Sequence, residues 1–283
     1  MPTLRYTLCD VFTDRPLCGN ALAVFTGAGD LPTDTLQAVA REMNLSEIVF
    51  VYPPKEGGQA RLRIFTPKAE LPFAGHPVLG AASVIGRSVQ TNPVHLETGA
   101  GVVTVEVDRQ GADVRGGQMT VPLPKVTPWA DPEPLLAALG LAQSILPIEL
   151  YDLGPQHVVL AVDSEAELQA LDPDMGRLAK AHSGGITVIA RRDAGLAMRV
   201  FAPALGVPED PATGSAAGPV AAHVCRHGWF DFGQTVQIAQ GEGLLRPSLL
   251  FATAHGSAER LLRVEVGGSV RTIGRGELRI GVV

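Results

Sequence analysis

Short hydrophobic runs separated by turn residues extend along the whole chain. Val, Ile, Leu and Phe dominate the runs, and Gly, Pro, Asn or Asp bound them, which is typical of β-strands. The predicted strands are Tyr6–Phe12, Leu22–Phe25, Ile48–Tyr52, Ala60–Phe65, Gly101–Val107, Gln118–Val121, Val158–Val162, Ile186–Ala190, Ala197–Phe201, Val236–Ile238, Leu249–Ala252, Leu261–Val266 and Leu278–Val282. Helical patterns are fewer and include Thr33–Met43, Pro134–Leu141 and Glu165–Ala170. These proportions predict an α+β fold with mixed or antiparallel sheets.

The chain contains an internal repeat. The segment Arg63–Pro67 resembles Arg199–Pro203, which lies 136 residues later. Further matched pairs are Glu47–Val51 with Gly185–Ile189, Ala74–His76 with Thr213–Ser215, Thr98–Gly99 with Gln240–Gly241 and, more loosely, Asn20–Val24 with His157–Ala161. Any single match could arise by chance. Because their order is kept and their offsets drift by only a few residues, the matches predict two copies of one fold.

The repeat predicts two domains. The N-terminal domain is expected to cover residues 1–118 and 270–283, and the C-terminal domain residues 119–269. The segment 121–134 between the copies has five prolines in fourteen residues, which predicts an extended crossover. Two similar domains are expected to enclose a cleft, and such clefts are preferred places for small-molecule sites.

Two segments of small and apolar residues occupy matching places in the copies. They are 74–85 and 212–225, and each predicts a buried helix because it has no polar face. Pro77 and Pro219 are expected near the helix starts, where a missing N–H costs little. A helix N-terminus with free N–H groups attracts carboxylates. The alternative is that these Gly-containing starts only cap two core helices.

Three titratable residues surround the predicted helices: Glu47, His76 and Asp210. A carboxylate at the edge of an apolar cleft is expected to have a raised pKa, which suits proton transfer. Singly, each could be a solvated or structural group, and Asp210 could merely complement a helix dipole. The copies differ here, since Gly185 matches Glu47, and one acid on a symmetric scaffold favours an acid/base role.

Composition and charge exclude several other classes. The 283 residues carry a net charge of −6 without a basic run, which argues against nucleic acid as the main partner. Apolar stretches are too short to span a bilayer, and no signal segment is evident, so we expect no membrane partner and a cytoplasmic location. The odd number of cysteines, Cys9, Cys18 and Cys225, predicts a reduced chain.

The sequence predicts neither a metal nor a cofactor. It has no GxGxxG motif after a strand, no P-loop, no HExxH and no CxxC. The remaining histidines show no paired metal spacing by this interpretation. They are His95, His157, His182, His223, His227 and His255.

Three long motifs resemble the phenazine-biosynthesis PhzF-like isomerase family. They are Arg41–Val51, Arg63–Pro77 and Glu209–Pro219. Shorter matches are Asp10–Thr13, Gly19 with Asn20, Gly154–His157, Gln240 with Gly241, and Arg246–Ser248. The resemblance runs from about residue 8 to about residue 276. It therefore covers nearly the whole chain.

The resemblance implies a diaminopimelate-epimerase-like fold of two pseudo-symmetric domains, each a curved, barrel-like sheet around a central helix. It also implies a cofactor-independent isomerase, whose best-known reaction moves a proton on trans-2,3-dihydro-3-hydroxyanthranilate in phenazine biosynthesis. By motif, the catalytic residues fall on Glu47, His76 and Asp210. The residues that bind the substrate carboxylate fall on Gly75, Gly214 and Ser215.

Two alternatives stay open at this stage. One is a non-catalytic protein that binds small carboxylates, and the other is a racemase or epimerase with a different substrate. Related epimerases carry paired cysteines where this chain has Ala74 and Pro211, which disfavours cysteine-based racemisation. The chain also has Ala21 and Leu245 where relatives have Pro and Gly. A homodimer is compatible with the resemblance.

Overall fold

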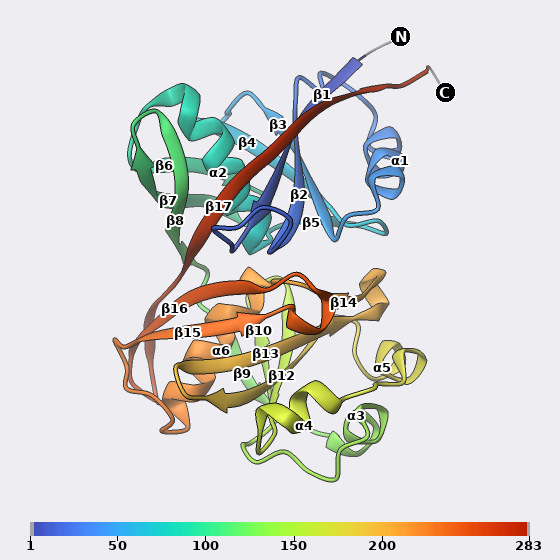
Figure 1. The fold of residues 1–283 in the computed structure, drawn as a ribbon, viewed down its shortest axis with the longest axis vertical. Coiled ribbons are helices and arrows are strands. Elements are labelled where there is room, and N and C mark those ends of the chain that lie inside the picture. The colour runs from blue at the N-terminus through green and yellow to red at the C-terminus, as the bar shows by residue number, and fades with distance from the viewer. Residues whose placement is uncertain (1–2, 282–283) are drawn as a thin grey trace. The chain divides into compact units, whose positions relative to one another are not determined.

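The computed structural model describes residues 3–281, and the chain divides into two compact units. The first unit joins the N-terminal part of the chain, up to Thr120, to the C-terminal part from Gly267. The second unit is Val121–Val266. One long strand, β17 (Leu261–Arg279), begins in the second unit and continues through the first (Figure 1).

The first unit is a closed ring of eight strands around helix α2 (Gly75–Val89) (Figure 1). Each strand pairs with the next, and β17 closes the ring onto β1. The ring strands, in order, are β1 (Thr3–Val11), β2 (Asn20–Thr26), β3 (Glu47–Tyr52), β4 (Ala60–Phe65), β6 (Val94–Thr98), β7 (Gly101–Gln110), β8 (Asp113–Val121) and β17. The short strand β5 (Glu70–Leu71) pairs with β4, and α1 (Thr33–Met43) spans the crossover between the parallel strands β2 and β3.

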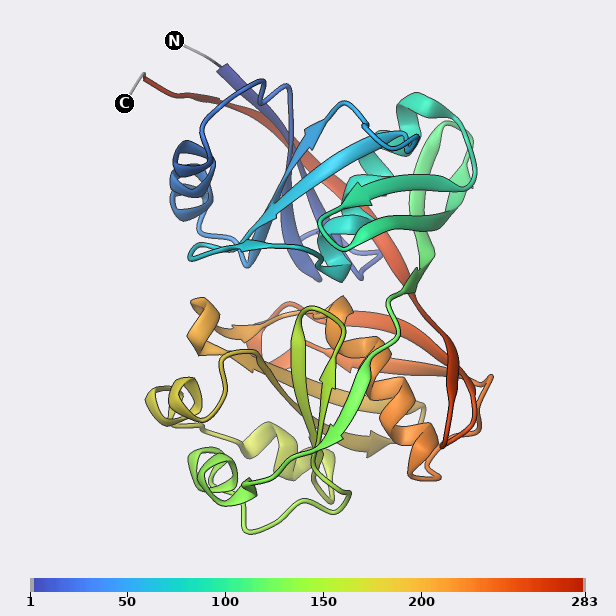
Figure 2. The same cartoon turned by 180° about the vertical axis from the view of Figure 1, so that it is seen from behind.

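The second unit repeats this plan around helix α6 (Gly214–Arg226) (Figure 2). Its strands are β9 (Lys125–Pro128), β10 (Glu149–Asp152), β11 (Gln156–Ala161), β12 (Gly185–Arg192), β13 (Gly195–Ala202), β14 (Val207–Asp210), β15 (Thr235–Gln240) and β16 (Ser248–Gly256). Three further helices, α3 (Pro132–Leu139), α4 (Glu165–Ala170) and α5 (Met175–Ala181), share one hydrophobic cluster with β11 and β12. Strands β11 and β12 are parallel, as are β13 and β15, matching β2 with β3 and β4 with β6.

Strand register confirms the predicted duplication. Ile48 pairs with Phe65 in the first unit, and Ile186 pairs with Phe201 in the second. The loosest sequence match was wrong by two residues. Leu22 lies opposite Glu47 in one parallel pair, and His157 lies opposite Gly185 in the other, so His157 corresponds to Leu22 and not to Asn20.

An ion pair is also duplicated. The guanidinium of Arg63 donates to both carboxylate oxygens of Glu70, at 2.7 and 2.6 Å. Arg199 donates in the same way to Glu209, at 2.9 Å to each oxygen. Each pair fastens a short strand to its longer neighbour through a planar two-bond contact, which is the strong form of a charged hydrogen bond. In the second unit this strand ends at Asp210.

The small-residue helices are buried as predicted, but one proline is not where the sequence placed it. Every α6 residue from Gly214 to Cys225 is buried. Pro219 is the sixth residue of α6, beyond the first turn, so it removes the N–H that would bond the carbonyl of Ser215. The prediction that Pro219 falls among the unpaired amides was therefore wrong.

Two further expectations need correction. The proline-rich segment 121–134 is not continuously extended, because it forms β9 and then starts α3 at Pro132. The predicted strands at residues 261–266 and 278–282 belong to one strand, β17, in the part that the structure describes. A glycine within β17 permits a close crossing with β8, since a Cβ at Gly267 would lie 2.7 Å from the carbonyl oxygen of Gly117.

Candidate active site

The first unit brings Glu47 and His76 together. Glu47 is the first residue of β3, and His76 is the second residue of α2. Oε2 of Glu47 lies 3.4 Å from Nδ1 of His76. The imidazole is 2% exposed and the Glu47 side chain 16% exposed, so part of the Glu47 side chain reaches solvent, whereas the ring and Oε2 of Glu47 are buried.

Burial makes His76 a neutral group. It lowers the pKa of His76 to about 3, because a charged imidazolium would lose its hydration. Nε2 of His76 is buried and has no hydrogen-bond partner among the described residues. Nδ1 of His76 faces Oε2 of Glu47 and lies within hydrogen-bond reach of Nδ2 of Asn20 at 3.5 Å.

Two polar residues that the sequence interpretation had not assigned to the site support this pair. The hydroxyl of Ser46 donates to Oδ1 of Asn20 at 2.8 Å, which turns Nδ2 of Asn20 toward His76 at 3.5 Å from Nδ1. Asn20 begins β2 and Ser46 immediately precedes β3. The sequence could have pointed to these two residues, because Asn20 lies in the Gly-Asn motif and Ser46 lies in the Asn-Leu-Ser-Glu motif.

The second unit holds Asp210 at the end of β14, 6% exposed. The hydroxyl of Thr213 donates to Oδ2 of Asp210 at 2.6 Å. Gln240 ties the same turn together, since its Nε2 donates to the backbone oxygen of Asp210 at 2.7 Å and its Oε1 accepts from the amide of Thr213 at 2.8 Å. Asp210 is thus held by the turn that follows it and by Gln240 of β15, and the sequence analysis had not predicted roles for Thr213 or Gln240.

The start of α6 carries a second polar pair. Gly214 and Ser215 are its first two residues, as Gly75 and His76 are in α2. Nε2 of His157 lies 3.0 Å from Oγ of Ser215, and both residues are buried. The first backbone amides of a helix have no acceptor within the helix, so both starts can receive an anion.

The carboxylates break the symmetry of the duplicated scaffold. Gly185 occupies the Glu47 position in the second unit. Leu71 occupies the Asp210 position in the first, since Leu71 pairs with Ile64 as Asp210 pairs with Val200. Each unit therefore has one of the two candidate carboxylates, Glu47 in the first and Asp210 in the second, and the two positions are not equivalent.

One group in the second unit has metal-ligand residue types. Donor atoms of Glu149, His223 and His227 lie within 4.8 Å of one another, so the prediction that the histidines lack paired spacing was wrong for His223 and His227, which are four apart at the end of α6. The carboxylate is already engaged, because Tyr151 donates to it at 2.7 Å and Arg226 lies 3.4 Å away.

These contacts describe a buried hydrogen-bond network. Burial raises the pKa of Glu149, but hydrogen bonds from His223, Tyr151 and His227 outweigh that effect and lower it to about 2. Nε2 of His223 also has, among residues 3–281, no hydrogen-bond partner of the kind that a metal-bound imidazole usually has. We interpret the group as the anchor of the α6 C-terminus on β10.

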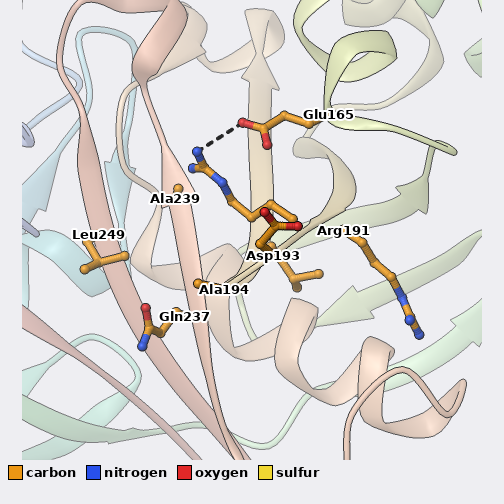
Figure 3. A pocket seen from close by; sticks show the side chains of 9 residues that line it. Glu165, Arg191, Asp193, Ala194, Gln237, Ala239 and Leu249 are labelled. Carbon is orange, nitrogen blue, oxygen red and sulfur yellow. Dashed lines mark ion pairs between the residues drawn. The ribbon is translucent and has the colours of Figure 1, made fainter.

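Figure 3 shows a separate hollow of about 530 Å³ on the second unit. Two of its charged side chains, Arg192 and Glu165, pair with each other at 3.2 Å, and Arg192 also bonds Glu242 at 3.0 Å. Arg191 stacks over the ring of Trp229, 4.7 Å from its centre. None of the predicted site residues lines this hollow.

The comparisons with known proteins identify the family. The family model described as phenazine biosynthesis-like protein matches residues 9–276. The chain belongs to this PhzC-PhzF family. It is 48% identical, over 274 residues, to the trans-2,3-dihydro-3-hydroxyanthranilate isomerase of Pseudomonas fluorescens, with 97% of this chain and 99% of the relative covered.

Solved structures of lower identity show the same fold. A PhzF-family protein of Bacillus anthracis superimposes with a TM-score of 0.85 at 22% identity, covering 99% of this chain and 100% of that chain. A hydroxyproline epimerase of Agrobacterium vitis superimposes with a TM-score of 0.69 at 13% identity, covering 98% and 92%. The predicted diaminopimelate-epimerase-like α+β fold is confirmed.

The described part of the chain contains no helix long and apolar enough to cross a membrane. Cys9, Cys18 and Cys225 are buried and form no disulfide in the described part of the chain.

Proposed function

We propose that this protein isomerises trans-2,3-dihydro-3-hydroxyanthranilate, the reaction for which its Pseudomonas fluorescens relative is named. The observation that carries the proposal is the Glu47 carboxylate held 3.4 Å from a buried, neutral imidazole. This pair lies at the start of a helix rich in small residues, and the chain aligns with this relative over nearly its full length, which supports an acid/base role for Glu47.

Glu47 is the proposed proton carrier. A C–H bond of the substrate breaks and its proton passes to the carboxylate, while the electron pair shifts along the conjugated system. The proton then returns to a different carbon, so that no atom or electron is gained or lost. His76 stays neutral throughout, and its buried ring lies 3.4 Å from the Glu47 carboxylate, which limits the positions that the carboxylate can take.

The remaining predicted residues have binding roles in this proposal. Asp210 accepts from the substrate's amino or hydroxyl group, and its hydrogen bond from Thr213 holds its orientation. Gly75 at the start of α2, and Gly214 with Ser215 at the start of α6, are the residues proposed to bind a carboxylate through helix-start donors.

The isotope experiment tests the proposal directly. Wild-type enzyme acting on the dihydro-hydroxyanthranilate substrate in D₂O should place deuterium on the carbon that gains the proton. Glu47→Gln keeps the shape of the side chain and should lower turnover by about 10²–10⁴-fold. Glu56→Gln is the matched control, because Glu56 is exposed. Full turnover in Glu47→Gln, or an inactive wild type, would contradict the proposal.

Cysteine-based epimerisation has little support. Ala74 and Pro211 stand at the positions where related epimerases carry cysteines. Burial raises the pKa of both Cys9 and Cys225 to about 11, so neither forms a thiolate readily near neutral pH. A carboxylate-binding protein without activity is the second candidate, and the turnover assay separates the two. A homodimer and a cytoplasmic location stay predictions.

A further inference from the structure

In the second unit, the ring of His157 fills the space beside Gly185, the residue that matches Glu47 of the first unit. Gly185 lies opposite His157 across the parallel strands β11 and β12. A Cβ at Gly185 would sit 2.5 Å from Nδ1 and 2.8 Å from Cε1 of His157, far inside contact distance. The imidazole therefore requires glycine at the position where the first unit carries Glu47.

The environment of His157 decides which ring nitrogen carries the hydrogen. Its Nδ1 is buried and has no hydrogen-bond partner among the described residues, while Nε2 lies 3.0 Å from Oγ of Ser215. The side chain is 4% exposed, and burial, with a smaller contribution from nearby His182, lowers its pKa to about 3. The ring is neutral and has a single N–H.

An unpaired buried N–H is rarer and costlier than an unpaired acceptor. The hydrogen therefore belongs on Nε2, and Nδ1 is bare. It follows that His157 donates to Oγ of Ser215. Because Oγ of Ser215 then accepts a hydrogen bond from His157, the hydroxyl hydrogen of Ser215 can donate to another group.

We propose that His157 is a positioning residue that orients the hydroxyl of Ser215 as a donor to a carboxylate at the N-terminus of α6. Ser215 is the second residue of that helix, so its hydroxyl adds to the unpaired amides of the first turn. The inference rests on the proposed function for the identity of the anion. His157 has no role in the proposed function, and in this inference its Nε2–H donates to Oγ of Ser215.

A structural explanation alone accounts poorly for this arrangement. The equivalent residue of the first unit is Leu22, fully buried, so a hydrophobic side chain satisfies the same backbone position. Histidine at this position leaves one polar nitrogen unpaired and excludes a side chain from position 185. That combination is explained by the bond to Ser215.

The test compares binding of anthranilate and of anthranilamide, which lacks the negative charge, by calorimetry on the full chain. Wild type should prefer the acid. Ser215→Ala and His157→Leu should each reduce that preference by about 10-fold or more, the loss expected for one hydrogen bond to a charged group. The double variant should be no worse than Ser215→Ala alone, because both changes remove the same donor. His157→Gln, whose amide can replace Nε2 as donor, should restore most of the preference.

The outcomes separate this inference from the proposed function. If His157→Leu keeps the wild-type preference while Ser215→Ala loses it, His157 does not position the hydroxyl. Equal binding of anthranilate and anthranilamide by wild type would contradict a carboxylate-binding role for the N-terminus of α6. Preference for the acid in a protein that does not turn over the dihydro-hydroxyanthranilate substrate would refute the proposed reaction and leave the role of His157 standing. Should His157→Leu fail to fold, His157→Asn, which is too short to reach Ser215, takes its place in the cycle.

Discussion

Oε2 of Glu47 lies 3.4 Å from Nδ1 of His76, and the histidine is held neutral by its burial. A charged imidazolium at this distance would stabilise the carboxylate and make it a weaker base. A neutral ring orients the carboxylate without that penalty. The pair thus places the Glu47 carboxylate beside a ring that carries no charge.

Introducing a second carboxylate beside His76 should change its titration. In Asn20→Asp the new side chain replaces Nδ2, which lies 3.5 Å from Nδ1, with an oxygen. A nearby negative charge favours the imidazolium, so the pKa of His76 should rise from about 3. Proton NMR of the imidazole as a function of pH measures the shift. Asn20→Ala, which adds no charge, is the control and should leave His76 neutral.

Acid should destabilise the fold through two buried histidines. The pKa values of His76 and His157 are lowered from 6.5 to about 3 in the folded state. Protons therefore bind the unfolded chain first, and the stability due to the neutral rings, complete above about pH 6.5, is lost as the pH falls toward 3. At pH 5 each ring should cost about 2 kcal/mol of unfolding free energy.

Urea unfolding at pH 7.5 and pH 5 checks this expectation. A His76→Gln variant should show a weaker dependence on pH than wild type, because one of the two coupled protonations is gone. An unchanged pH dependence in this variant would show that His76 does not contribute. The exposed residue Glu277 offers a control substitution, Glu277→Gln, away from both rings.

Loss of the buried charge at Glu149 should destabilise the second unit. Its carboxylate accepts from Tyr151, His223 and His227, so Glu149→Gln removes the charge on which three donors converge. Breaking a buried charged network typically costs about 3–5 kcal/mol. Thermal unfolding should show the loss, and Glu259→Gln on the surface should change stability by no more than about 0.5 kcal/mol. A loss of turnover without a loss of stability would contradict this structural role.

The duplicated ion pairs provide an internal comparison. Arg199 is 14% exposed and also donates to the backbone carbonyls of Leu168 and Leu171, whereas Arg63 is 21% exposed and also donates to the side-chain hydroxyl of Thr33. Lysine cannot reproduce the two-bond geometry of arginine. Arg199→Lys should therefore destabilise the protein more than Arg63→Lys. Equal effects in chemical denaturation would mean that the carbonyl contacts of Arg199 contribute nothing measurable.

Much of this architecture is present in local sequence patterns. Helix Thr33–Met43 and helix Glu165–Ala170 have the predicted bounds, because their apolar spacing is strong and turn residues flank them. The duplication was visible since strands that pair alike keep alike residues, as Arg63–Pro67 and Arg199–Pro203 do. Short elements such as β5, β14 and α5 escaped prediction, because a few residues carry too little periodicity to stand out.

The sequence by itself determined the two-copy α+β plan, the buried small-residue helices and the identity of Glu47, His76 and Asp210 as candidates. Contacts between residues far apart in the chain were decided by the tertiary structure alone. His157 meets Ser215 across 58 positions, and Glu149 meets His223 across 74. No local pattern encodes such partners. They arise because strand register and helix packing bring the side chains together. The need for glycine at position 185 is likewise visible only in the tertiary structure, where the ring of His157 fills the space that a Cβ would take.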